Sequence, residues 1–200
     1  MRRMSQTRQL SRDEIKTLPL FPALGPAQIT VVDRAALPGA LAALRAARVA
    51  GFDTESRPTF RKGEEATGPH LIQLATSEHA YLFPVSDAEV LAALGALLAS
   101  GEVLVVGFDL RSDKRHLRDR FGIECKSLLD VGSLFQSDSP TITVGAVQAV
   151  ARVFGQYFRK SKKLSTSNWG AKVLSEAQQV YAANDAWVAL RIYQALRPGA

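Results

Sequence analysis

Five polar side chains in three separate segments have types and spacings suited to binding metal ions. The segments, with the side chains concerned, are GFDTES (Asp53 and Glu55), GFDLRSDKRHL (Asp113) and YAANDA (Tyr181 and Asp185). Carboxylate oxygens are the ligands that hard divalent cations prefer. A carboxylate in apolar surroundings is costly unless it is paired or bound to a metal. The sequence therefore predicts that these segments converge on one cation site.

Asp53 and Glu55 follow the apolar run VAGF, which predicts a buried strand over residues 48–54. Side chains two positions apart on a strand point to the same face, so both carboxylates can approach one pair of metal ions. A strand-end turn with two solvated acids has the same pattern. The D-x-E spacing alone therefore does not decide between a metal site and a turn.

Asp113 stands one helical turn before Leu117 in a helix expected over 113–120, so the two side chains share a face. If Leu117 packs in the core, Asp113 lies at the edge of that face, near the end of a strand expected over 103–108. The alternative is a first-turn acid favoured by the helix dipole. Asp109, at the end of the same strand, competes for the role, and spacing does not choose between the two aspartates.

Tyr181 and Asp185 are four positions apart on the last predicted helix, about 175–196, and therefore lie on one face. Alanines around them keep this part of the helix slim and allow it to approach a sheet closely. A tyrosine one turn from a metal-binding carboxylate can hold the water that the metal activates. The alternative is a tyrosine packed in the core with Asp185 facing solvent.

The elements that must position these side chains indicate an α/β fold. Strands are expected at 29–33, 48–54, 71–76, 80–85 and 103–108, and helices at 36–47, 87–99, 113–120, 130–136, 143–154 and 175–196. Ser86 is the expected N-cap of the second helix. Strands with helices between and after them predict a three-layer domain with a mixed sheet. We expect this domain to span residues 26–200, after an N-terminal arm, 1–25, that contains a short helix.

Composition narrows the class of partner. A net charge of +6 and a pI near 9.7 favour a polyanion such as nucleic acid. The chain has no run of roughly 18 apolar residues, so no membrane partner is expected. Its single cysteine, Cys125, excludes an internal disulfide and fits a reducing cytoplasm. The oligomeric state does not follow from the sequence.

Four segments resemble, in order, the DEDD superfamily of 3′–5′ exonucleases: GFDTES, HLIQLAT, GFDLRSDKRHL and SNWGAKVLSEAQQVYAANDAWVALRIYQAL. The resemblance is greatest to ribonuclease D and the Werner syndrome exonuclease domain, and it covers about residues 29–197. It implies a ribonuclease H-like three-layer α/β fold, with a central mixed β-sheet flanked by helices. It also selects Asp113 over Asp109, because the family's second motif has its acid four residues before a leucine.

Tyr181, with Val180 rather than a histidine before it, matches the DEDDy branch of this superfamily. The four acids would hold two divalent cations, Mg²⁺ or Mn²⁺. The implied reaction is hydrolysis of phosphodiester bonds from the 3′ end of DNA or RNA, with release of nucleoside 5′-monophosphates. The alternative is a catalytically silent nucleic-acid-binding module, which loss of any one acid would favour. The implied catalytic residues, all present, are Asp53, Glu55, Asp113, Tyr181 and Asp185.

Two basic stretches, RPTFRK and RKSKK, are expected to contact the nucleic acid. Their cations can bind backbone phosphates, and the phenylalanine can stack on a terminal base. The alternative is a pair of solvated loops with an ordinarily packed phenylalanine. The predicted nucleic-acid-binding residues are Arg57, Phe60, Arg61, Lys62, Arg159, Lys160, Lys162 and Lys163. Elsewhere, we expect Trp169 to pack a loop against the last helix, Gln73 to be structural and Asp130 to cap a helix.

Overall fold

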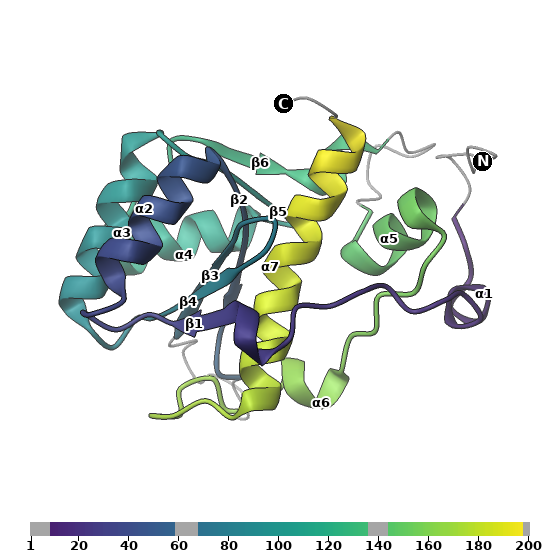
Figure 1. The fold of residues 1–200 in the computed structure, drawn as a ribbon, viewed down its shortest axis with the longest axis horizontal. Helices are drawn as coiled ribbons and strands as arrows, with labels where there is room; N and C mark the ends of the chain where they lie inside the picture. The colour runs from purple at the N-terminus through teal and green to yellow at the C-terminus, as the bar shows by residue number, and fades with distance from the viewer. Residues whose placement is uncertain (1–8, 59–67, 136–143, 198–200) are drawn as a thin grey trace.

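A mixed sheet runs through the middle of the molecule in the computed structural model, which describes residues 9–58, 68–135 and 144–197 (Figure 1). Within those residues its strands are β1 Ile29–Val31, β2 Val49–Glu55, β3 Leu71–Ala75, β4 Ala80–Pro84, β5 Leu104–Gly107 and β6 Leu128–Asp130. Their order across the sheet is β1-β4-β3-β2-β5-β6. The five strands expected from the sequence are confirmed, and β6 is additional.

The pairing directions place the carboxyl ends of β2 and β5 at the same edge of the sheet. β2 is antiparallel to β3 and parallel to β5. The pairs β1–β4 and β5–β6 are parallel, and β3–β4 is antiparallel. In the β2–β3 ladder, Asp53 stands opposite Gln73 and Glu55 opposite Leu71. The strand that carries two candidate acids is therefore held on both sides.

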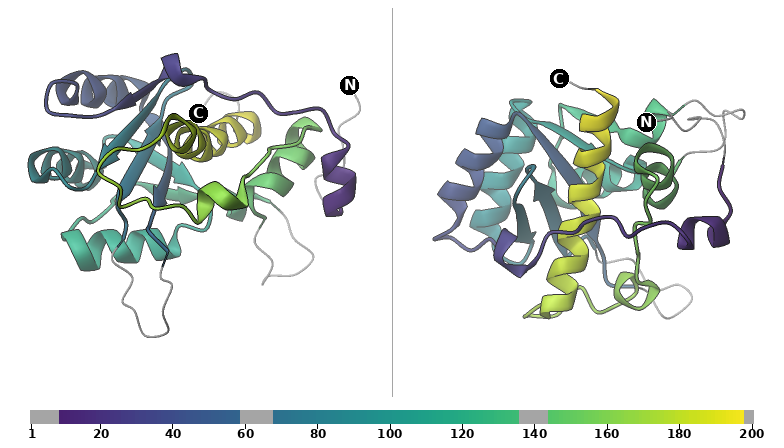
Figure 2. Two further views of the ribbon diagram at one scale, coloured as in Figure 1. Left: turned by 90° about the horizontal axis from the view of Figure 1, so that it is seen from below. Right: turned by 45° about the vertical axis from the view of Figure 1, so that its right-hand side comes forward.

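Helices cover both faces of the sheet, which confirms the predicted three-layer fold (Figures 1 and 2). On one face lie α2 Leu37–Ala47, α3 Ala88–Ser100 and α4 Arg111–Phe121, which pack on one apolar cluster. On the other face lie α5 Ala146–Phe154 and α7 Glu176–Leu196. The short helical segments are α1 Arg12–Lys16, η1 Pro26–Gln28, η2 Val131–Leu134 and α6 Lys162–Ser165. None of the described helices is long and apolar enough to cross a membrane.

Some boundaries differ from the sequence prediction for local reasons. The N-cap of α3 is Asp87 and not Ser86, because the Asp87 carboxylate accepts hydrogen bonds from the backbone N–H groups of Glu89 and Val90. The helix expected over 130–136 is only the 3₁₀ segment η2, although Asp130 does cap it as predicted, by accepting from the Gly132 N–H at 2.8 Å. The sequence predicts no helix where α6 lies.

The N-terminal segment packs against the domain rather than standing apart from it. The Leu20 backbone forms a bridge with Tyr157, beyond the end of α5. Further on, the Leu24 N–H donates to the Asn184 side-chain oxygen at 2.8 Å, and the Asn184 amide donates back to the Leu24 carbonyl at 3.1 Å. Asn184 is buried on α7, next to Asp185. This segment therefore fixes the helix turn that presents one of the candidate acids.

Gly51 sets how closely α7 approaches β2. A Cβ atom at this position would lie 2.0 Å from the carbonyl oxygen of Ala186 on α7. Real atoms do not approach so closely, so only glycine allows the helix to lie directly on the strand. The close approach brings Asp185 of α7 over the part of β2 that carries Asp53.

Gly51→Ala should destabilise the protein by about 3 kcal/mol, because the added methyl group meets backbone that cannot move independently of the sheet. The measurement is urea unfolding followed by circular dichroism. Gly39→Ala is the matched control, since nothing lies within 4 Å of a Cβ there and the residue is inside α2. The free energy of unfolding of that control should rise by up to about 1 kcal/mol, because alanine has a higher helix propensity than glycine. Equal stabilities of the two variants would contradict the prediction.

Candidate metal centre

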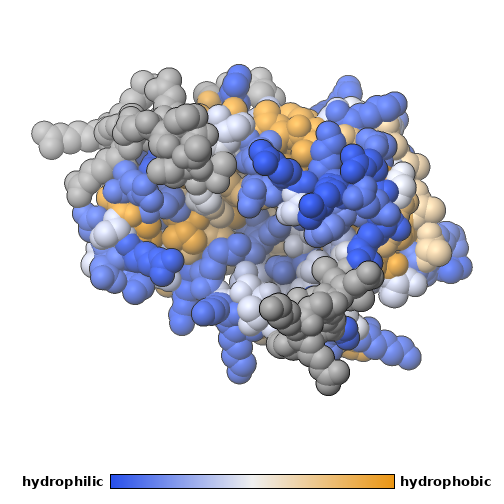
Figure 3. Space-filling model, turned by 180° about the vertical axis from the view of Figure 1, so that it is seen from behind, coloured by the Kyte–Doolittle hydropathy of each residue, from blue (hydrophilic) through white to orange (hydrophobic). Residues whose placement is uncertain are grey.

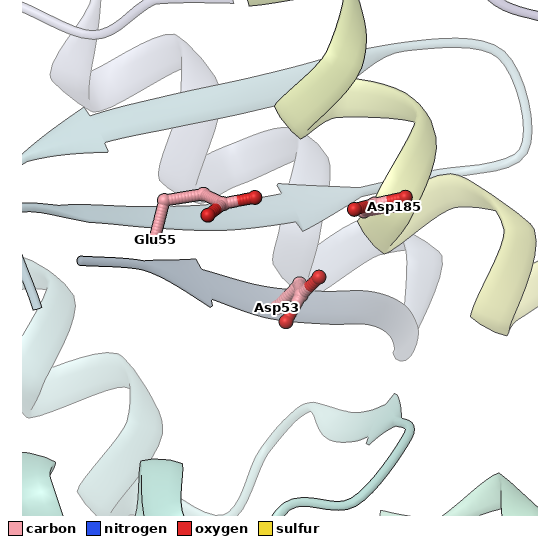
Figure 4. Close-up of side chains that lie close together, drawn as sticks. All are labelled: Asp53, Glu55 and Asp185. Carbon is pink, nitrogen blue, oxygen red and sulfur yellow. The ribbon is translucent and has the colours of Figure 1, made fainter. Parts of the chain in front are cut away.

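Three carboxylates from two distant segments meet at the carboxyl end of β2. Asp53 and Glu55 of β2 and Asp185 of α7 each offer an oxygen atom, and these atoms lie within 4.8 Å of one another (Figure 4). Within the three described ranges, this is the group of acids with the geometry of a metal site. Glu55 and Asp185 are buried, and Asp53 is partly buried.

The electrostatics of this cluster favour a cation. Burial and the neighbouring charge of Asp185 raise the pKa of Asp53 to about 8. Burial and the charge of Asp53 raise the pKa of Glu55 to about 9. Burial also raises the pKa of Asp185, against the opposing effect of Lys160. Its Oδ1 atom is buried and has no hydrogen-bond partner among the described residues. Hard carboxylate oxygens with one acceptor left unsatisfied fit a divalent metal ion.

Lys160 extends its ammonium group into the carboxylate cluster. The Lys160 Nζ lies 2.8 Å from Asp185 Oδ2 and 5.8 Å from the centroid of the Tyr181 ring. Burial alone would lower the pKa of this ammonium, but the negative charges of Asp185, Asp53 and Glu55 outweigh that effect and raise it. Sequence reasoning placed Lys160 among the phosphate-contacting cations. It did not foresee an ion pair with a candidate metal ligand.

Tyr181 is held by a neighbour on each side. Its hydroxyl interacts with the Asp185 carboxylate one turn along α7, and its ring lies against Trp169 with centroids 5.9 Å apart. Trp169 is 2% exposed, which confirms that it packs the loop before α7 against that helix. Burial and the charge of Asp185 raise the pKa of Tyr181. The hydroxyl therefore stays protonated and can donate a hydrogen bond at neutral pH.

Asp113 reaches the site from the opposite face of β2. Thr54 lies between the two acids of β2 and points away from them, since side chains alternate along a strand. Its hydroxyl donates a hydrogen bond to the Asp113 carboxylate. Asp113 is not within the group of three, but its charge contributes to the raised pKa of Asp53. Burial raises the pKa of Asp113 itself.

The rival aspartate, Asp109, has a different environment. It is exposed at the end of β5, in a left-handed backbone conformation with φ of 53°. It lines a cavity of about 420 Å³ together with Asp53, Asp185 and Lys160. The N-cap of α5, Gly145, and the first three residues of that helix also line the cavity. The cavity is in the size range of small-ligand sites, and the cluster of acids opens into it.

Gln73 is a polar residue at the site for which the sequence suggested only a structural role. It stands opposite Asp53 in the β2–β3 ladder and is fully buried. Neither atom of its side-chain amide has a hydrogen-bond partner among the residues that the structure describes. Buried amides are normally satisfied by a protein group or by a bound water. Gln73 is therefore placed to orient Asp53 or a water molecule beside it.

The predicted phosphate-contacting residues fall into two groups. Arg159, Lys162 and Lys163 are exposed at and just before α6, beside Lys160. Arg57 is exposed just after β2, where its backbone N–H donates to His70 Nδ1 at 3.2 Å. The remaining three predicted residues, Phe60, Arg61 and Lys62, lie outside the described residues.

A family model described as a 3′–5′ exonuclease matches residues 28–199. The chain belongs to the 3′–5′ exonuclease family. It is 30% identical over 151 residues to the bifunctional 3′–5′ exonuclease/ATP-dependent helicase WRN of Mus musculus. That match covers 74% of this chain and 11% of WRN, so this member of the family corresponds to a small part of its relative's length.

Solved structures of the exonuclease family share the fold. RNase D of Escherichia coli, an exoribonuclease involved in structured RNA processing, is 26% identical with a TM-score of 0.68, over 84% of this chain and 44% of that one. The Nibbler EXO domain of Aedes aegypti has a TM-score of 0.68 at 24% identity, over 86% of this chain and 88% of that one. The expected ribonuclease H-like fold and the resemblance to ribonuclease D and WRN are confirmed.

Proposed function

We propose that this chain is a metal-dependent 3′–5′ exonuclease that hydrolyses phosphodiester bonds from the 3′ end of DNA or RNA and releases nucleoside 5′-monophosphates. The observation that carries the proposal is the convergence of Asp53, Glu55 and Asp185 within 4.8 Å, with the Asp185 Oδ1 atom left without a hydrogen-bond partner in the described part of the chain. Family membership supports the reaction class. The metal ions belong to the same proposal as two divalent cations, Mg²⁺ or Mn²⁺.

Each side chain would have a distinct role. Asp53, Glu55 and Asp185 would hold the metal ions, which supply a water of lowered pKa and neutralise charge at phosphorus. Asp113 would be the fourth acid that holds the metal ions, and it would do so from the other face of β2, where Thr54 fixes its carboxylate. The Tyr181 hydroxyl, held beside Asp185, would donate a hydrogen bond to the attacking water and orient it.

The test uses 5′-labelled single-stranded DNA, recessed duplex DNA and short RNA, each with Mg²⁺, Mn²⁺ or EDTA. We expect a ladder that shortens from the 3′ end with metal and no shortening in EDTA. Protein that binds these substrates but shortens none of them with either metal would instead be the catalytically silent binding module.

Tyr181→Phe should lower kcat by about 10- to 100-fold and leave KM within about twofold, because the lost hydrogen bond orients the attacking water and not the bound strand. Steady-state hydrolysis of a short labelled strand measures both constants. Tyr193→Phe is the control, since Tyr193 is a buried tyrosine of the same helix that packs in the apolar cluster around α5. A loss of kcat shared equally by both variants would contradict the role of Tyr181.

We also propose that the protein acts in the cytoplasm, with its buried Cys125 as a free thiol. Fractionation of the source cells followed by an immunoblot tests this location. Recovery of the protein only from an oxidising compartment would contradict it.

A further inference from the structure

The outward side of α4 carries a row of cations. Arg111, Lys114, Arg115 and Arg118 have the i, i+3, i+4, i+7 spacing that places side chains on one side of a helix. All four residues are exposed. We name this row the α4 stripe. Neither of the two basic stretches singled out from the sequence contains any part of it.

Fewer cations of the α4 stripe are paired with an acidic side chain than on the surface around α2 and α3. Around α2 and α3, Arg34 pairs with Asp87 and Glu89, and Arg45 pairs with Glu102 at 2.9 Å. In the α4 stripe, Arg118 pairs with Asp119 at 2.9 Å. The other three cations have no ion pair within the described part of the chain. The stripe therefore keeps positive charge available for a polyanion.

The α4 stripe is fixed close to the metal centre. On the inward side of the same helix, Leu117 is fully buried and Asp113 accepts the hydrogen bond from Thr54. Seen from below, α4 lies on one side of the strand ends and α6, with its lysines, on the other (Figure 2, left). The face turned to the back in Figure 1 is strongly hydrophilic over much of its area (Figure 3).

The lining of the cavity at the metal centre indicates that the α6 side and the α4 side would contact different strands of a nucleic acid. It is lined by Lys160 and the start of α5, and no residue of α4 lines it. A strand whose 3′ end enters this cavity is therefore met by the cations near α6. The α4 stripe is left for a second backbone. From Arg111 to Arg118 the α4 stripe rises roughly 10 Å along the helix, which matches about three base-pair steps of a duplex.

We propose that the α4 stripe binds the backbone of the complementary strand in a duplex whose recessed 3′ end enters the metal centre. This inference rests on the proposed exonuclease function and adds the form of the substrate. The strand being degraded contacts the cavity, and the uncleaved strand lies along α4. The enzyme then holds a recessed duplex more tightly than the corresponding single strand.

The test compares two variants that lose the same charge. Arg111→Gln/Arg115→Gln removes two cations of the α4 stripe, and Arg12→Gln/Lys126→Gln removes two exposed cations elsewhere. Fluorescence anisotropy measures the binding of a labelled recessed duplex and of its longer strand alone, in EDTA, from 50 to 200 mM salt. For the stripe variant we expect duplex binding at least about tenfold weaker and a salt slope shallower by up to about 1.8, at about 0.9 for each lost phosphate contact. Its single-strand binding should change no more than that of the control.

Three results would overturn the inference. Equal losses on duplex and single strand would mean that the α4 stripe holds the degraded strand. If the stripe variant loses no more affinity for the duplex than the control variant does, the α4 stripe is an ordinary solvated helix face. Wild-type protein that binds the single strand as tightly as the duplex would remove the substrate preference. Hydrolysis of a short single strand by the wild-type protein is scored separately and reports on the exonuclease function itself.

Discussion

Asp53→Asn should reduce 3′-end hydrolysis on the order of 10³-fold. Bound metal supplies several kcal/mol of transition-state stabilisation, and each 1.36 kcal/mol is a factor of ten in rate. The ligand atoms of Asp53, Glu55 and Asp185 all lie within 4.8 Å of one another, so the substitution removes one of the three carboxylates of the cluster. Asparagine keeps the shape and can still accept the hydrogen bond that the Thr54 N–H makes at 2.9 Å. The loss of rate is therefore expected without a loss of fold.

The same substitution should make the metal-free protein more stable above neutral pH. It removes a carboxylate whose pKa burial and Asp185 raise to about 8. This raised pKa costs the folded state stability that builds up as the pH rises from about 4 to about 8, so replacing the acid should raise Tm by several degrees in EDTA at pH 8.5. Asp33→Asn is the control, an exposed acid whose oxygen accepts from the Ala36 N–H. Full activity of Asp53→Asn with either metal would contradict the proposed site.

Metal-free protein should lose stability as the pH rises from about 4 to about 9. In the folded protein, desolvation and the charges of neighbouring acids raise the pKa of Asp53 to about 8 and that of Glu55 to about 9. In the unfolded chain both pKa values return to about 4. Between these limits the folded state binds more protons than the unfolded state, so the free energy of unfolding falls with pH. The total loss should be several kcal/mol, since one fully shifted group contributes about 1.4 kcal/mol per pH unit.

Divalent metal should reverse this loss only where the acids are ionised. Thermal melts in EDTA and in MnCl₂ at pH 5.5 and pH 8.5 test the expectation. Mn²⁺ should raise Tm by several degrees or more at pH 8.5 and by much less at pH 5.5, because protons then occupy the ligands. Asp53→Asn should lose most of the metal-dependent rise. A metal-free protein more stable at pH 8.5 than at pH 5.5 would show that the three acids are not coupled as the structure places them.

Local patterns sufficed to predict the elements that carry the acids. The apolar run before Asp53 gave the strand, and the i, i+4 relation of Tyr181 to Asp185 gave their shared helix face. The segment β6 was missed because it has only three residues, each partly buried, and becomes a strand by pairing with β5. The choice of Asp113 over Asp109 came from family resemblance, since the spacing fitted both.

Contacts between residues far apart in the sequence could not be predicted from the spacing of residues along the chain. Lys160 belongs to a basic stretch that reads as a solvated loop, and only the folded chain brings its ammonium to Asp185. Likewise, Gln73 lies in an apolar strand, and its position beside Asp53 depends on the register of β2 with β3. The hydrogen bond from Thr54 to Asp113 links opposite sides of the sheet through one residue of β2. Each of these depends on tertiary placement and not on a local pattern.

The packing of α7 on β2 also determines when the metal centre comes into being during protein synthesis. Asp53 and Glu55 leave the ribosome with the first strands, but Lys160, Tyr181 and Asp185 follow much later. The Gly51 surface that receives α7 stays uncovered until that helix has been made. Contacts between such distant segments form slowly. A nascent chain that stops before α7 lacks Asp185 and Tyr181, so the cluster of Asp53, Glu55 and Asp185 cannot yet form on it.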